Sequence, residues 1–143
     1  MWSRFAIALV VSGCCASTAF ADGIEPGLWK IMTRVATGVV LGPPQPSQKC
    51  LTAAQTGDLA ATFSPVANTI NSECAPLEPS FDGGKLSWKL VCKGQLNMEL
   101  TGEFNFDGPR HYSATIHSKA EMGGQQVANS QSVIDAQWVS ECP

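Results

Sequence analysis

The C-terminal half of the chain alternates apolar and polar residues over three long stretches. Apolar side chains occupy nearly every second position of residues 86–92, 96–106 and 112–116, and polar side chains fill most positions between them. An alternation with period two puts one face of a β-strand against a core and the other face in water. The pattern therefore predicts three strands of an antiparallel sheet with one dry face.

Glycine-containing turns lie between these stretches. Gly83-Gly84, residues 93–95 and residues 107–109 fall at the distances expected of β-hairpin loops. A further stretch over residues 126–139 follows Gly123-Gly124. The chain therefore predicts an antiparallel meander that this last stretch extends.

The loop lengths also predict how neighbouring strands are aligned. A three-residue loop at 93–95 places Trp88 opposite Leu100, and a loop of residues 107–111 places Phe104 opposite Ala114. Both registers bring the apolar faces of neighbouring strands together, which is the strongest constraint on strand register.

The first half of the chain predicts one strand and one short helix. Residues 27–35 contain strand-forming side chains, and the prolines of residues 42–46 predict a loop after them. Thr52 and Gln55 have the spacing of a capping box, which predicts a short helix up to residue 62. The fold class is mainly β: an antiparallel meander or a small barrel-like sheet with one short helix, stapled by disulfides. Closure of the sheet into a barrel stays open.

The N-terminus has the anatomy of a secretory signal peptide. Arg4 precedes the apolar run of residues 5–11, and Ala19-Phe20-Ala21 forms an A-x-A cleavage site. The run is too short to span a bilayer, so no transmembrane segment is expected. Residues 1–21 are thus predicted to be a signal peptide and residues 22–143 a single exported domain, expected in the periplasm of a Gram-negative bacterium.

A second interpretation of the N-terminus stays open. Val11-Ser12-Gly13-Cys14 resembles a bacterial lipobox, which would make Cys14 a lipid-modified N-terminus held at a membrane. The apolar run before Cys14 is short for a signal, and the better-formed cleavage site lies seven residues later. The pattern favours the soluble product.

Charge and motifs exclude several function classes. Removing Arg4 would take the formal net charge from −3 to −4, and the sequence contains no basic cluster, so nucleic acid is not an expected partner. The hydrolase motif G-x-S-x-G, the zinc motif H-E-x-x-H and a phosphate-binding glycine loop are absent from the sequence. We therefore expect no cofactor and no enzymatic activity.

Four cysteines remain after the predicted cleavage. An even number in a small exported domain indicates two disulfides, and four cysteines allow three pairings. The sequence has no C-x-x-C motif among them, which argues against a zinc or redox site. The four residues are Cys50, Cys74, Cys92 and Cys142.

Turn geometry favours one of the three pairings. A three-residue turn around Gly83 places Cys74 opposite Cys92, which leaves the other two cysteines for each other. A two-residue turn instead pairs Phe81 with Leu86 and puts Cys74 on the wrong face. A bulge between the two segments would reconcile both registers.

The order of several short motifs is similar to that of a known family. These motifs are Pro26-Gly-Leu-Trp-Lys30, Cys50-Leu-Thr52, Ser87-Trp-Lys-Leu-Val-Cys92, Thr101-Gly-Glu-Phe104 and Glu141-Cys142. Over roughly residues 25–142 the chain resembles a family of small exported proteobacterial proteins catalogued as a domain of unknown function, whose members begin with a PGLWE-like motif. Lys30 replaces the usual acidic residue, and Ser140-Glu-Cys142 replaces the usual Gly-Asp-Cys ending. The resemblance implies export, four cysteines and a β-rich fold, and no particular activity.

One polar group could hold a metal or move a proton. The predicted register places His117 opposite Thr101, with Glu99 and Glu103 on its diagonals. A histidine near two carboxylates can bind a cation or transfer a proton. The simpler interpretation is the wet face of a sheet, which we favour because no metal-ligand spacing accompanies the three residues.

The aromatic residues of the dry face have two interpretations. They could line a cavity for an apolar molecule, as in small β-barrels, or fill the core of a thin domain, which is the commoner arrangement. The cavity candidates are Trp29, Trp88, Leu100, Phe104, Phe106 and Tyr112.

The leading function hypothesis is a non-enzymatic periplasmic binding protein for a small apolar ligand or an envelope protein. The alternative is a structural or stress-related envelope accessory protein with a packed core. A metal-binding or enzymatic role ranks third.

Overall fold

The computed structural model describes residues 23–66 and 72–143. The predicted signal peptide and the alternative lipidation site at Cys14 lie outside the described residues. Among the described residues, no helix has the length and apolar character needed to cross a membrane.

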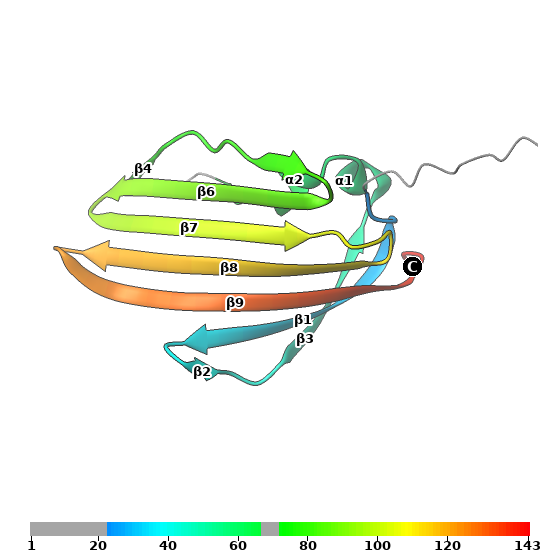
Figure 1. The fold of residues 1–143 in the computed structure, drawn as a ribbon, viewed down its shortest axis with the longest axis horizontal. Helices are drawn as coiled ribbons and strands as arrows, with labels where there is room; N and C mark the ends of the chain where they lie inside the picture. Colours follow the sequence, from blue (N-terminus) through cyan, green and yellow to red (C-terminus); the bar gives the residue numbers. More distant parts are fainter. Residues whose placement is uncertain (1–22, 67–71) are drawn as a thin grey trace, which may run out of the picture.

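The described strands form one open antiparallel sheet (Figure 1). Its central order is β2-β1-β9-β8-β7-β6-β4, with β3 also paired to β1 and β5 also paired to β6. The strands are β1 (Gly27–Thr37), β2 (Val40–Leu41), β3 (Gln45–Leu51), β4 (Ser72–Cys74), β5 (Ser80–Asp82), β6 (Lys85–Gly94), β7 (Leu96–Asn105), β8 (His111–Met122) and β9 (Gln125–Ser140). The prediction of a mainly β meander is confirmed, and the sheet is open rather than barrel-like.

The predicted alignment of β7 and β8 is confirmed, because Phe104 pairs with Ala114. The predicted alignment of β6 and β7 is wrong by two residues: Trp88 pairs with Gly102 instead of Leu100. Cys92 pairs with Met98, whereas the expected three-residue loop would pair it with Leu96, and the Asn97 side chain accepts a hydrogen bond from the backbone N–H of Gly94 (3.1 Å). A shift of two residues leaves every side chain on its predicted face.

Two short strands pair with the outer edge of β6 in different registers. Phe81 pairs with Leu86, as a two-residue turn requires, and Cys74 pairs with Cys92, as a three-residue turn requires. The irregular segment between β4 and β5 absorbs the difference, so both predicted alignments occur in one molecule.

Two short helices stand where one was predicted. The helix α1 (Ala53–Gly57) starts at a capping box of Thr52 and Gln55, as predicted, and α2 (Leu59–Phe63) follows. Asp58 lies between them in a non-helical conformation, and its carboxylate accepts a hydrogen bond from the backbone N–H of Ala61. A side chain that caps a new helix competes with continuation of the old one, which explains the interruption.

Strand β3 begins inside the predicted proline loop. It pairs along β1 from Gln45 to Leu51, so that Pro46 lies in a strand opposite Met32. Proline is tolerated there because β3 has no second neighbour among the described strands.

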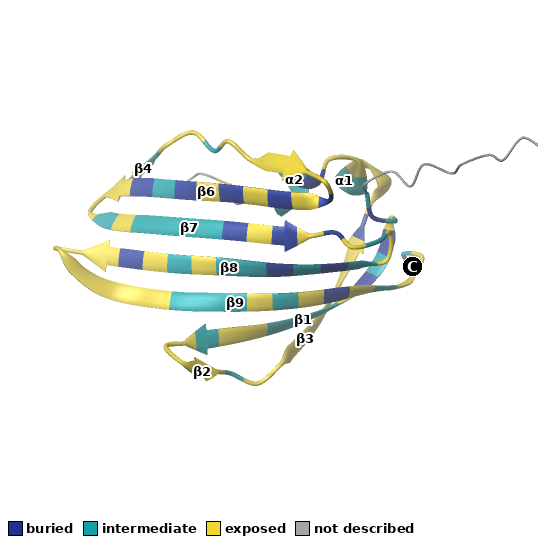
Figure 2. Ribbon diagram, viewed as in Figure 1, coloured by how far each residue is buried: buried dark blue, intermediate teal, exposed yellow. Residues whose placement is uncertain are grey.

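The core lies on one face of the sheet, at the end that the helices cover. Figure 2 shows buried and exposed residues alternating along β6, as the sequence pattern predicted. Phe63 and the buried Leu59 of α2 pack against this face, which we call the inner face. Trp29, Trp88 and Phe104 face them from three different strands.

Two disulfides join distant parts of the chain. Cys74–Cys92 links β4 to β6, and Cys50–Cys142 links β3 to the segment after β9. This is the predicted pairing. Disulfides persist in oxidising compartments, so the structure agrees with a protein outside the cytoplasm.

Candidate functional site

The six residues proposed to line an apolar cavity lie in or beside the core. Five are buried, and Leu100 is partly buried against them. Their rings contact one another, as Trp29 and Tyr112 show with centroids 5.3 Å apart. Phe63, which the sequence did not single out, contributes ring contacts to Phe104, Phe106 and Tyr112.

The indole N–H groups of this cluster are also satisfied by the protein. Trp29 Nε1 donates to the carbonyl of Glu25 (3.1 Å), and Trp88 Nε1 donates to the carbonyl of Phe63 (3.0 Å). A buried indole N–H costs free energy unless it finds such a partner. These side chains are thus held in place by mutual packing and by the backbone.

A shallow cleft lies outside this cluster, between the helices and β5. It has a volume of about 490 Å³ and is lined by residues of α1, α2, the N-terminal segment and β5. Phe81 lines it and remains 42% exposed, while Leu59 beside it is buried. The cleft could accept a small apolar group against the Phe81 ring.

The candidate metal group lies on the outer, polar face of the sheet. His117 pairs with Thr101 and Glu99 pairs with Lys119, as predicted. Glu99 Oε2 lies 3.2 Å from Lys89 Nζ, so this carboxylate faces a cation. Within the described ranges, no group of three or more His, Cys, Asp and Glu side chains has the arrangement of a metal site.

The other histidine bridges two carboxylates. His111 Nδ1 lies 2.6 Å from Asp107 Oδ1, and His111 Nε2 lies 2.9 Å from Asp135 Oδ2. These hydrogen bonds, that of Asp107 above all, raise the pKa of His111 above its ordinary value, although partial burial opposes them. The His111 ring joins the β7–β8 loop to β9.

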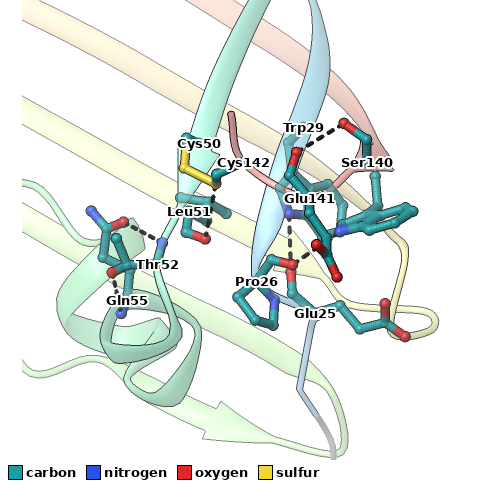
Figure 3. Close-up of a disulfide and its surroundings, with 11 residues drawn as sticks. Glu25, Pro26, Trp29, Cys50, Leu51, Thr52, Gln55, Ser140, Glu141 and Cys142 are labelled. Atoms are coloured by element: carbon teal, nitrogen blue, oxygen red, sulfur yellow. Dashed lines mark hydrogen bonds between the residues drawn. A yellow bond between two sulfur atoms is a disulfide. The ribbon is translucent and has the colours of Figure 1, made fainter.

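Hydrogen bonds hold the N-terminal segment to the same end of the sheet. Figure 3 shows Glu25 and Pro26 beside Trp29, whose Nε1 donates to the carbonyl of Glu25. The Arg110 guanidinium lies over the Trp138 ring (4.3 Å), and its Nε donates to Glu25 (3.0 Å). Trp138 Nε1 donates to the carbonyl of Pro26 (3.0 Å). Gly27 (φ +146°) has no room for a Cβ, which would overlap Trp138. Pro26, Gly27 and Trp29 of the Pro26–Lys30 motif thus have structural roles at this end of the sheet.

Three consecutive exposed apolar residues lie at the other end of the sheet, in the turn after β1 and in β2. Val39 is 103% exposed, Val40 70% and Leu41 47%. We call these three residues the apolar hairpin. Figure 1 shows this turn at the end of the sheet away from α1, α2 and the C-terminus. A run of three exposed aliphatic residues is unusual on a protein surface that binds nothing.

Sequence reasoning missed the apolar hairpin because its signal is not periodic. Val39-Val40-Leu41 is a run of aliphatic residues between Gly38 and Gly42, and such a run can equally belong to a buried strand. The edge position of β2 exposes it.

Comparisons with known proteins give one result. Neither the search of curated proteins nor that of solved structures found a match. A family model does match, over residues 24–142, which confirms the resemblance expected from the motif order. The chain belongs to the family DUF3617, described as proteins of unknown function.

Proposed function

We propose that the protein is a non-enzymatic binding protein of the cell envelope that acts through the apolar hairpin. The observation that carries this proposal is the exposure of three consecutive aliphatic side chains, Val39, Val40 and Leu41. Exposed apolar surface gains roughly 25 cal/mol for each Å² that a partner removes from water. Because the large aromatic side chains are occupied with one another, the free apolar surface lies outside the core.

The compartment supports this proposal. Two disulfides suit an oxidising compartment, and the N-terminal sequence has the anatomy of an export signal. The periplasm provides both conditions. The partner would therefore be a component of the envelope.

Site-specific photo-crosslinking in living cells tests the proposal. A photoreactive amino acid replaces Val40 in one variant and Val139 in a control. Val139 is also aliphatic and 50% exposed, but it lies near the C-terminal end of β9, away from the apolar hairpin. We expect discrete crosslinked products from position 40 and none from position 139. Equal products from both positions, or none from position 40, would reject the apolar hairpin as a binding surface. Either result would favour an accessory protein that binds no partner through this hairpin.

A small apolar ligand is a second candidate, favoured by the cleft beside Phe81. The cleft of about 490 Å³ lies between elements that could hold an acyl or aromatic group. Native mass spectrometry of protein recovered from the periplasm without refolding should then show an adduct, which Phe81→Ser removes. A bare mass in the unchanged protein would contradict this candidate.

A further inference from the structure

The edge of the sheet that carries the apolar hairpin is basic in an otherwise acidic protein. Residues 26–57 contain Lys30, Arg34 and Lys49 and no Asp or Glu. All 12 acidic residues of the chain lie outside this segment, and the formal net charge of the whole sequence is −3. The segment comprises β1, β2, β3 and α1.

The three cations are free to meet a partner. Each is exposed, and none forms an ion pair with another described residue. Lys30 and Arg34 project from the same face of β1, four residues apart. Lys49, on the edge strand β3, pairs with Trp29 and therefore lies on the other face of the sheet. Asp135 lies on the neighbouring strand opposite Met32, but its carboxylate is bound to His111.

The chemistry of this edge distinguishes between kinds of partner. Protein interfaces concentrate their binding energy in Trp, Tyr and Arg side chains that fill pockets. The apolar hairpin instead presents Val39, Val40 and Leu41 at a protruding turn, followed by Pro43-Pro44. Branched aliphatic side chains at a protruding tip can enter the acyl region of a bilayer, and nearby cations gain energy from anionic headgroups.

We infer that the partner of the apolar hairpin is the surface of an anionic lipid bilayer, on which the β1–β3 edge docks. This inference rests on the proposed function and names its partner. The hairpin enters the boundary between headgroups and acyl chains. Lys30 and Arg34 reach the lipid phosphates from one face of the docked edge, and Lys49 reaches them from the other face. The acidic remainder of the molecule points away from the membrane.

Vesicle flotation tests the inference with the disulfide-bonded protein recovered from the periplasm. The probe is a vesicle of phosphatidylethanolamine with phosphatidylglycerol, and a phosphatidylcholine vesicle is the neutral comparison. We expect binding to the anionic vesicle that weakens as salt is added, since exposed charges are screened. Equal binding to both vesicles, or binding to neither, would overturn the inference.

Variants separate the two contributions. Val40→Ser with Leu41→Ser should weaken vesicle binding at least tenfold, because both side chains lose their transfer into the apolar phase. Lys30→Gln with Arg34→Gln should weaken it about fivefold for each charge removed. The matched controls are Val139→Ser and Lys85→Gln, which lie outside the β1–β3 edge and should bind like the parent. Parent-like binding by both test variants would reject the inference.

The two proposals can fail separately. Protein–protein products from position 40 in cells, together with no vesicle binding, would keep the apolar hairpin as a binding surface and reject the bilayer as its partner. Absence of both crosslinks and vesicle binding would reject both proposals.

Discussion

The indole ring of Trp88 lies over the backbone of Gly102, its partner on the neighbouring strand. A Cβ built on Gly102 would overlap three atoms of that ring. Trp88 is 6% exposed, and its Nε1 donates to the carbonyl of Phe63. Because Gly102 has no side chain, the Trp88 ring has room to pack between the sheet and α2.

Gly102→Ala should destabilise the fold. The added methyl must displace the Trp88 ring or the strand, and overpacking of this kind costs about 1–3 kcal/mol. Urea unfolding followed by tryptophan fluorescence would measure the loss. Gly57→Ala is the matched control, because nothing lies within 4 Å of a Cβ at that position. Equal stability of the Gly102→Ala variant and the parent would contradict the steric account.

Removal of Cys50–Cys142 should cost more stability than removal of Cys74–Cys92. The first closes a loop of 92 residues and the second a loop of 18. Loop entropy of the unfolded chain then predicts losses of about 4–5 and about 3 kcal/mol for the two double Cys→Ala variants. Denaturant unfolding of both variants under oxidising conditions would rank them. The reverse order would show that packing around Cys92, which is fully buried, outweighs loop closure.

Stability should fall as the pH rises through the pKa of His111. Asp107 first and Asp135 second raise this pKa in the folded state, so folding holds a proton that the unfolded chain releases near pH 6.5. The contribution is complete below about pH 6.5 and is lost as the pH rises through the higher folded pKa. Its size should be about 1 kcal/mol or less, because both carboxylates are largely exposed.

The measurement is the free energy of unfolding from about pH 5.5 to 8.5, the range around the ordinary histidine pKa. His111→Gln should flatten this dependence, and His117→Gln is the comparison variant, which removes a histidine from an exposed site on the outer face. If the pH dependence of stability is unchanged in the His111→Gln variant, another group causes it.

Tyr112 should ionise later than an ordinary tyrosine. Burial raises its pKa to about 12, because the phenolate would lose its hydration in the core. It is the single tyrosine of the chain, so ultraviolet absorbance of tyrosinate reports on this group alone. The folded protein should stay protonated above pH 10, and the unfolded protein should titrate near pH 10. Stability should therefore decline as the pH rises from about 10 to 12.

The order of strands in the C-terminal half was predictable because each pairs with its successor. Loop length and alternation together predicted that Phe104 faces Ala114 across β7 and β8. The same reasoning misplaced Trp88 by two residues. Registers two residues apart keep the same faces buried, so the alternation cannot distinguish them. The fit of the Trp88 ring over Gly102 selects one of them.

The candidate surface was harder to predict than the fold. The aromatic residues of the dry face were identified, but a pattern cannot tell a core from a cavity lining. Ring contacts from Phe63, on a helix distant in sequence, decide that they fill the core. The polar residues around His117 lie at the predicted register, and the alternation of apolar and polar positions predicted that they lie on the outer face.

The sequence by itself determined β1, the long strands β6 to β9, their dry and wet faces, the capped start of α1 and the favoured cysteine pairing, because these depend on near neighbours and short turns. Only the tertiary structure decided that the sheet stays open, that β3 joins the edge of β1 and that the apolar hairpin is exposed. These features depend on which distant segments meet. Contacts between distant segments depend on how whole surfaces pack, and a local sequence pattern does not describe that packing.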